Sequence, residues 1–314
     1  MPRIPRPSLA GLGSGGLLAG VLLVLCAIAS VQLGASIAKT VFDRIDPAAM
    51  TLLRLAFGAA VILLIARPRI RSWNGPAWRS MLFLGLSLAS MNLIFYIALA
   101  RIPIAVAVTL ELIGPLILAL VQSRRLVDFV WVGVAAIGVG VIGVQSFTGD
   151  LDPLGVVLAL VAGGCWAAYI LASASVGRHV AGVGGLAGAL VIGTLAVLPF
   201  GLLPAIDAIG ADPSVLLPAF LVAMLSSAIA YGLELLALRR VPTRVFGILM
   251  SLEPASAAIF AFLVIGEVLS GWDLLALALV IVASAGVAVT AARGRREPPP
   301  TSGAEPPGQV PPLP

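Results

Sequence analysis

Ten long apolar stretches restrict the folds that this chain can adopt. They cover residues 17–38, 47–66, 80–100, 103–122, 129–147, 154–174, 184–205, 215–238, 243–265 and 271–292. A helix needs about 20 apolar residues to cross a bilayer, so each stretch is long enough for one crossing. We therefore predict an all-α polytopic membrane protein with ten transmembrane helices.

The composition agrees with this prediction and excludes most other classes of protein. Hydrophobic residues make up 60% of the 314 residues, and charged residues make up only 11%. Soluble domains contain about 25% charged residues, and no soluble core of this size encloses so much apolar surface. Transmembrane β-barrels are excluded because their strands read as short alternating segments, whereas these runs are continuous. Disordered chains, disulfide scaffolds and nucleic-acid-binding proteins do not have this composition.

The basic residues indicate the orientation of the helices. If the N-terminus lies in the cytoplasm, every segment on that side is basic. Together these segments hold fifteen of the 19 Lys and Arg residues. Only Arg44 and Arg101 fall in the loops on the opposite side, which carry aspartates instead. Cytoplasmic loops of membrane proteins are enriched in Lys and Arg. We therefore expect a multi-pass protein with both termini in the cytoplasm.

The two halves of the chain resemble each other at a constant offset of 139 residues. Pro115 falls on Pro254, and residues 98–103 fall on residues 237–242 without a gap. Each half holds five predicted helices, an odd number, so the two copies must have opposite orientations in the membrane. Inverted repeats are typical of secondary transporters, whose binding site lies near the midplane between the halves.

This repeat predicts the organisation of the chain. Residues 17–150 form the first five-helix repeat, and residues 151–292 form the second. Residues 1–16 are a cytoplasmic N-terminal segment. Residues 293–314 are rich in proline and arginine, and we expect a disordered cytoplasmic tail there.

Four of the charged residues inside predicted helices or at their ends are functional candidates, because charge within the membrane marks such sites. Glu111 and Glu253 lie near the midplane, each close to a proline that loosens the helix backbone. Such a glutamate can exchange a proton or bind an ammonium group, or it can be a protonated residue hydrogen-bonded between helices. Arg54 needs an anionic partner, either a substrate carboxylate or a glutamate such as Glu111. For Lys39, a substrate role and snorkelling to the interface are both open.

Neutral polar and aromatic side chains are numerous enough to predict a polar cavity, although hydrogen bonding between helices explains any single one. The candidates are Gln32, Ser36, Asn92, Tyr96, Trp166, Tyr169, Ser226, Ser227 and Tyr231. The other acidic residues near the helices receive structural interpretations. Glu234 is expected to pair with Arg239, and Glu267 and Asp273 are expected to be solvated at the outer surface.

Motifs of enzymes and metal proteins fail in this context. Residues 138–143 match the dinucleotide-binding fingerprint, but no strand precedes them. The only histidine, His179, sits in a basic loop, which excludes a catalytic triad that depends on a histidine in the membrane. Cys26 and Cys165 have no further ligand types close in the sequence, so neither a disulfide nor a metal site is expected. We expect no enzymatic activity, no cofactor and no metal.

The sequence resembles the EamA-type carriers of the drug/metabolite transporter superfamily over residues 17–292. The motifs that carry the resemblance are Arg54, Cys165-Trp166-Ala167, Arg240-Val241-Pro242, Glu253-Pro254 and Gly266-Glu267. A narrower likeness, to threonine and homoserine exporters within that family, rests on residues 32–39, 110–115, 124–131, 242–247 and 249–254. This chain has Arg124-Arg125 at a position where the general family has a second Gly-Glu pair. The narrower group shares this departure from the general family. The proline-rich tail has no counterpart in that group.

The resemblance implies a ten-helix carrier of the bacterial inner membrane that exports small amino acids by alternating access, driven by protons. Its partners would then be an amino acid, protons and the lipid bilayer, and no nucleic acid. Substrates vary within the family, so carriers of other metabolites or of cationic drugs are alternatives, as is a non-transporting membrane protein. The sequence leaves the oligomeric state and the direction of transport open.

Overall fold

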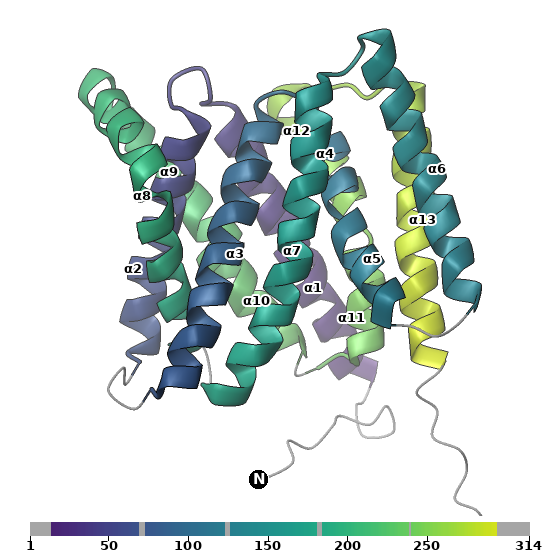
Figure 1. Ribbon diagram of the computed structural model, residues 1–314, viewed down its shortest axis with the longest axis horizontal. Helices are drawn as coiled ribbons and strands as arrows, with labels where there is room; N and C mark the ends of the chain where they lie inside the picture. Colours follow the sequence, from purple (N-terminus) through teal and green to yellow (C-terminus); the bar gives the residue numbers. More distant parts are fainter. Residues whose placement is uncertain (1–13, 69–72, 123–125, 181–183, 239, 294–314) are drawn as a thin grey trace, which may run out of the picture.

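A computed structural model describes residues 14–68, 73–122, 126–180, 184–238 and 240–293 (Figure 1). Ten helices within these ranges are long and apolar enough to cross a membrane, and the same ranges contain no strand. The prediction of an all-α protein with ten membrane-spanning helices is therefore confirmed. The predicted terminal segments lie largely outside the described residues, as do Arg124, Arg125 and Arg239.

Seven crossings are single helices, and three are divided. The single helices are α1 (Ser14–Lys39), α2 (Pro47–Ala66), α3 (Gly75–Leu99), α6 (Leu126–Thr148), α7 (Pro153–His179), α8 (Gly184–Ala211) and α13 (Gly271–Arg293). The fourth crossing consists of α4 (Ile104–Glu111) and α5 (Ile113–Gln122), and the ninth of α11 (Thr243–Met250) and α12 (Glu253–Ile265). The eighth contains a 3₁₀ turn η2 (Pro213–Val215), α9 (Leu216–Ala223), a π-helical turn η3 (Met224–Ile229) and α10 (Ala230–Leu238).

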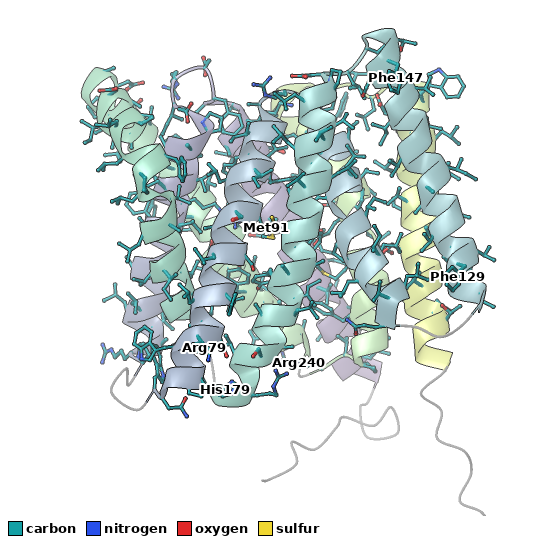
Figure 2. The ribbon with its side chains drawn as sticks, viewed as in Figure 1. Arg79, Met91, Phe129, Phe147, His179 and Arg240 are labelled. Atoms are coloured by element: carbon teal, nitrogen blue, oxygen red, sulfur yellow. The ribbon has the colours of Figure 1, made fainter. Side chains whose placement is uncertain are left out.

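The helices stand side by side, and the two ends of the described chain lie at the same end of the bundle (Figure 1). We call this end, where α1 begins and α13 ends, the chain-end side. Arg79, His179 and Arg240 lie at this side, whereas Phe147 lies at the opposite end (Figure 2). An even number of crossings requires this arrangement. That the chain-end side faces the cytoplasm stays a prediction.

Aspartates at the opposite end start three of the crossings. Asp46, Asp152 and Asp212 each precede a proline, and each side chain accepts a hydrogen bond from the backbone N–H two residues further on. The proline supplies a preset φ and has no N–H to leave unpaired. The Asp-Pro pairs therefore fix where these helices begin.

Two of these aspartates also hold ion pairs between loops. Arg101 donates to Asp152 over 2.9 Å, and Arg44 donates to Asp212 over 2.9 Å. The hydrogen bond from Arg101 is the main reason that the pKa of Asp152 lies below its usual value. A lowered pKa favours the folded state above the ordinary pKa of the group, and this contribution is lost as the pH falls through the lowered value.

The helix contacts have the symmetry of an inverted repeat, in which each contact between the halves recurs between the equivalent helices. Helix α3 packs on α7, and the equivalent pair, α10 and α1, is also in contact. Helix α2 packs on α8, and α6 packs on α13, so equivalent crossings meet each other directly. Pro103 and Pro242, equivalent in the repeat, precede α4 and α11 with closely similar backbone angles (φ −55°, ψ 142° and φ −58°, ψ 143°). The boundary between Asp150 and Leu151 falls in the turn between the halves and stays a prediction.

The fourth and ninth crossings break at equivalent positions for the same reason. Helix α4 ends at Glu111, four residues before Pro115, and α11 ends at Met250, four residues before Pro254. A proline has no N–H to bond the carbonyl four residues earlier, and its ring crowds that carbonyl. Each proline therefore ends the helix ahead of it close to the middle of the crossing.

The break at Glu111 packs tightly on α7. A Cβ atom added at Gly163 would meet the carbonyl oxygen of Glu111, and one added at Gly114 would meet the backbone of Gly163. Small residues let membrane helices approach this closely. The position of Glu111 therefore depends on the absence of a side chain at Gly163.

We predict that Gly163→Ala destabilises the protein by about 1–3 kcal/mol, because the new methyl group must displace backbone. Gly164→Ala is the matched control, since a Cβ atom there meets nothing within 4 Å. Alanine is the better helix former by about 1 kcal/mol, so this control should be neutral or slightly stabilising. Thermal unfolding of the purified variants in detergent measures both. Equal melting temperatures for the two variants would contradict the packing described.

Candidate functional site

A cavity of about 500 Å³ lies inside the bundle. It is lined by α1, α2, α3, both parts of the divided fourth and ninth crossings, α7, the eighth crossing and α13. Met91, which lies about halfway along α3 in Figure 2, is part of its wall. Ten of the thirteen predicted candidate residues line this cavity: Gln32, Arg54, Asn92, Tyr96, Glu111, Trp166, Tyr169, Ser226, Tyr231 and Glu253.

Arg54 is buried at the cavity wall without a carboxylate partner. Its Nη1 donates to the hydroxyl of Tyr96 over 3.0 Å, and its guanidinium carbon lies 5.3 Å from the centre of the Tyr96 ring. Nη2 lies 3.4 Å from the carbonyl oxygen of Ser226. Within the described residues, Arg54 forms no ion pair. An ion pair with Glu111, the structural alternative for Arg54, is therefore not observed.

The π-helical turn η3 supplies the carbonyl group that Arg54 contacts. A π turn widens the helix and is frequent at functional sites. Here the Leu225 carbonyl accepts a hydrogen bond of 2.7 Å from the hydroxyl of Ser30, and the Ser226 carbonyl faces Arg54. Gly34 of α1 lies against this turn, because a Cβ atom there would meet the Ser226 hydroxyl. The turn is therefore held between α1 and α2.

Unpaired polar atoms gather at the cavity. Four buried side-chain atoms have no hydrogen-bond partner within the described part of the chain, and three belong to residues that line the cavity. These three are Oε1 of Gln32, Nε of Arg54 and Oγ of Ser226. An unpaired buried donor or acceptor costs about 1–3 kcal/mol. The site thus offers an acceptor, a donor and a hydroxyl to a molecule that enters it.

Three carboxyl groups share the cavity. Glu111, Glu234 and Glu253 line it, and the other two interact electrostatically with Glu253. No hydrogen bond or ion pair reaches any of these carboxyl groups from elsewhere in the described ranges. Glu234 was expected to pair with Arg239, which lies outside the described residues. The sequence did hold a signal that Glu234 lies at the cavity. It follows the predicted cavity residue Tyr231 by three positions, and residues at that spacing share a helix face.

Three predicted site residues, Ser227, Ser36 and Lys39, are not brought to the cavity. The hydroxyl of Ser36 is buried and donates to the Gln32 carbonyl over 2.9 Å, one turn earlier in the same helix. Lys39 donates to the Ile102 carbonyl over 2.7 Å and forms an ion pair of 2.8 Å with Glu267. The substrate role predicted for these residues therefore has no support in the geometry.

Glu267 has a structural role, and the expectation that it is merely solvated was wrong. Gly266 adopts a left-handed conformation (φ 75°) that ends α12 and turns the chain toward α4. Glu267 then accepts a hydrogen bond of 2.8 Å from the backbone N–H of Ile104, at the start of α4. The N-terminus of a helix favours a negative charge because its first N–H groups are unpaired. Together with Lys39, Glu267 thus joins α1, α4 and α12.

Asp273 is also buried, and the expectation of solvation was wrong for it too. Its carboxylate accepts hydrogen bonds from the backbone N–H and the hydroxyl of Ser270, and the Ser270 hydroxyl accepts one from the N–H of Asp273. This is a reciprocal cap at the start of α13. Gln145 of α6 also donates to Asp273 over 3.2 Å. The group links two helices and lies away from the cavity.

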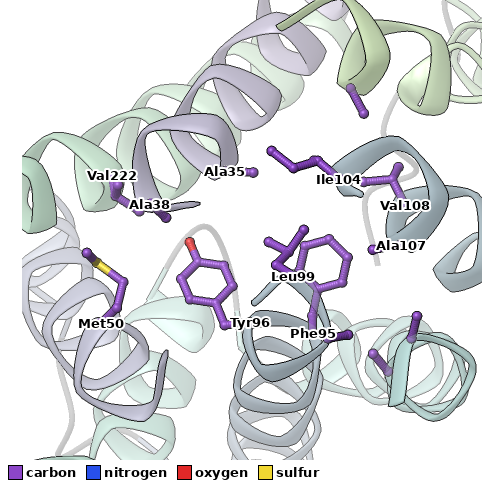
Figure 3. Close-up of a cluster of buried hydrophobic side chains, with 14 of the residues drawn as sticks. Ala35, Ala38, Met50, Phe95, Tyr96, Leu99, Ile104, Ala107, Val108 and Val222 are labelled. Carbon is purple, nitrogen blue, oxygen red and sulfur yellow. The ribbon is translucent and has the colours of Figure 1, made fainter. Parts of the chain in front are cut away.

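The cavity is closed at the end opposite the chain-end side. Figure 3 shows Tyr96, Leu99 and Ile104 gathered beside Ala35 and Ala38 of α1 in a buried apolar cluster. The Lys39–Glu267 ion pair lies at the same end, at the start of α4. The cavity extends the other way, through side chains of α10, α11 and the last part of α13.

Comparison with known proteins gives the family. A model of the EamA-like transporter family matches residues 153–289, which lie within the second half of the chain. The threonine/homoserine exporter RhtA of Salmonella typhimurium (strain SL1344) is 41% identical over 283 residues, covering 88% of this chain and 93% of its own. RhtA of Escherichia coli (strain K12) is 40% identical over 275 residues, covering 86% and 91%. A solved crystal structure of 20% identity aligns with a TM-score of 0.58 over 90% of this chain and 99% of its own, which supports the fold alone.

We predict that a double-mutant cycle on Lys39→Met and Glu267→Gln gives a coupling energy of about 1–3 kcal/mol, because removing one partner strands a partly buried charge. The exposed pair Arg44 and Asp212 is the control, and about 0.2–1 kcal/mol is expected there. The side chains of the first pair are 19% and 15% exposed, against 43% and 39% in the second. Unfolding free energies of the single and double variants give both values. A first coupling no larger than the second would show that Lys39 and Glu267 do not hold this end together.

Proposed function

The chain belongs to the EamA-like transporter family, and we propose that it exports small amino acids such as threonine and homoserine. The export would cross the bacterial inner membrane in exchange for protons, with both termini in the cytoplasm. The observation that carries this proposal is the guanidinium of Arg54, buried without a carboxylate partner in a cavity that it shares with three carboxyl groups.

The two ends of an amino acid match these charges. Its carboxylate pairs with Arg54, whose Nε is unpaired and whose Nη1 already orients the Tyr96 hydroxyl. Guanidinium groups bind carboxylates in a planar, two-pronged geometry. The ammonium group is directed toward Glu111 or Glu253, as its charge requires. Each charged end of the substrate thus exchanges its water for a protein group of opposite charge.

The unpaired neutral atoms favour a substrate with a hydroxyl group. Gln32 Oε1 can accept a hydrogen bond from that hydroxyl, and Ser226 Oγ can complete the contact. A site built around unpaired polar groups rejects analogues that cannot pair with them, often by a large factor. Threonine and homoserine carry such a hydroxyl, whereas valine and α-aminobutyrate do not.

The excess of carboxyl groups supports coupling to protons. Among the described residues, three carboxyl groups and one guanidinium line the cavity, and they carry two net negative charges when all are ionised. An ammonium group or protons must offset these charges in a medium of low dielectric constant. Substrate and protons therefore compete for the same groups, which is what antiport requires. One proton moving inward gains about 2.3 kcal/mol per 100 mV, enough for more than tenfold accumulation outside.

In alternating access, the cavity would close at the chain-end side and open at the opposite end. We propose that the two five-helix halves rock about the midplane and that the ion pair between Lys39 and Glu267 opens when the outer end opens. The equivalent crossings would then close the chain-end side. Carriers with inverted repeats commonly work through such rigid-body rocking around a fixed site.

A carrier of cationic metabolites or drugs is the second candidate, because carboxyl groups outnumber the one guanidinium at the cavity. Arg54 argues against a substrate with positive charge alone, since it would repel one. The two candidates differ in whether a carboxylate on the substrate is required. Competition by threonine and by its amide, which lacks the carboxylate, separates them.

We predict that liposomes containing the purified protein and unlabelled threonine take up labelled threonine by counterflow. Arg54→Gln should reduce this uptake at least about tenfold, because one charge-assisted pair to the carboxylate is worth about 1.5–3 kcal/mol. Arg44→Gln is the control, an arginine of the opposite end outside the cavity. Valine should compete poorly and threonine amide should not compete. If Arg54→Gln transports threonine normally, the carboxylate does not bind there.

We predict that Glu111→Gln abolishes the response of threonine flux to an imposed pH gradient, because the amide carries no exchangeable proton. Asp207→Asn is the control, since Asp207 is an exposed residue of α8 outside the cavity. Threonine flux in liposomes is measured at several imposed pH gradients, with the same buffer components in each. A pH response in Glu111→Gln equal to that of the wild type would refute the coupling role of this residue.

A further inference from the structure

A second concavity of about 730 Å³ lies between α3 and α7 at the chain-end side. Arg79 and His179 line it, and both lie at that end of the bundle (Figure 2). None of its lining residues belongs to the central cavity. The groove is therefore a separate feature that the proposed transport function does not use.

One end of the groove carries a polar cluster. The hydroxyl of Ser80 donates to the Pro76 carbonyl over 2.8 Å, which leaves its oxygen to accept from Ser175 at 3.2 Å. His179 Nδ1 lies 2.9 Å from the Ser175 carbonyl oxygen, so this nitrogen carries a hydrogen and donates. The opposite ring nitrogen, Nε2, has no hydrogen-bond partner in the described ranges. The imidazole is thus held in place, and Nε2 can donate to an anion when the ring carries a hydrogen on both nitrogens.

Arg79 adds a fixed positive charge beside this cluster. It is exposed and forms no ion pair or hydrogen bond with the rest of the described chain. Among the described residues, no acidic side chain lines the groove. The polar end of the groove is therefore suited to an anion with several acceptor oxygens.

The rest of the groove is apolar and runs into the depth of the membrane. Phe83 is 63% exposed and Leu171 is 53% exposed, and the small residues Ala168 and Ala172 also line the groove. Ser87, also in the wall, follows Arg79 by eight residues along α3, which is about 12 Å at 1.5 Å per residue. An anion at Arg79 thus has an apolar channel leading from it toward the middle of the bilayer.

We propose that this groove binds one anionic phospholipid, with its phosphate on Arg79 and His179 and an acyl chain along Phe83 and Leu171. Basic pockets between membrane helices are suited to anionic lipid headgroups. A free phosphate ion would use the polar end alone and would gain nothing from the apolar channel. The lipid uses both parts, and its glycerol region lies where the Ser80 and Ser175 hydroxyls are.

The test compares lipids added to the purified protein in a neutral detergent. Phosphatidylglycerol should raise the melting temperature at least about 3 °C more than phosphatidylcholine at the same mole fraction, because a ligand that binds the folded state stabilises it. The double variant Arg79→Gln and His179→Gln should lose this difference. Mass spectrometry of the intact protein should detect one retained phosphatidylglycerol in the wild type and none in the double variant.

Two further variants define the site. Arg178→Gln is the matched control and should keep the full response, since Arg178 is an exposed neighbour of His179 outside the groove. Ala168→Phe fills the apolar channel and should abolish the response while the phosphate-binding groups remain. Equal stabilisation by the two lipids, or an unchanged response in the double variant, overturns the proposal. Inorganic phosphate that reproduces the shift, or a full response in Ala168→Phe, overturns the assignment to a lipid.

Discussion

A guanidinium group that cannot lose its charge lies inside ten membrane-spanning helices, and much of the surrounding structure serves to accommodate it. Charge at this depth is unfavourable unless polar groups replace water. Arg54 obtains a hydroxyl and a ring face from Tyr96 and a backbone carbonyl from Ser226, but no carboxylate in the described part of the chain. The arrangement holds the charge in the membrane and leaves part of its binding capacity to a substrate.

The departures from regular α-helix lie at the cavity. In a bilayer, backbone groups outside regular helices are tolerated only where protein or a water-filled space pairs with them. Pro115 and Pro254 interrupt their crossings at equivalent positions, and the π turn at Ser226 presents a carbonyl group toward Arg54. These three departures from the α-helix all border the same cavity. The inverted repeat places two of them opposite each other by symmetry.

The sequence predicted the crossings well because apolar length decides them almost alone. The fold class and most of the polar residues at the cavity followed from helix spacing and from the rarity of charge in apolar segments. Helix α7 extends to His179 and α8 to Ala211, beyond the predicted ends, because a helix continues past the apolar region until a turn stops it. Such extensions lie outside what hydropathy reports.

The misplaced residues share one cause. Lys39 pairs with a residue 228 positions away, and Asp273 is bound to Gln145, 128 positions away. Such pairs depend on how loops from different crossings meet, which periodicity within one helix does not describe. The pairing expected for Glu234 stays a prediction, since Arg239 lies outside the described residues. Tyr231, which shares a helix face with Glu234, was the signal that Glu234 lines the cavity.

The central claim is that substrate and protons compete for one set of carboxyl groups opposite Arg54. Titration calorimetry of threonine binding to the purified protein, repeated in buffers with different enthalpies of ionisation, counts the protons released on binding. Competition predicts that threonine binds and that protons are released, with a smaller number as the pH rises and the carboxyl groups lose their protons. Threonine binding with no proton release at any pH would contradict the claim.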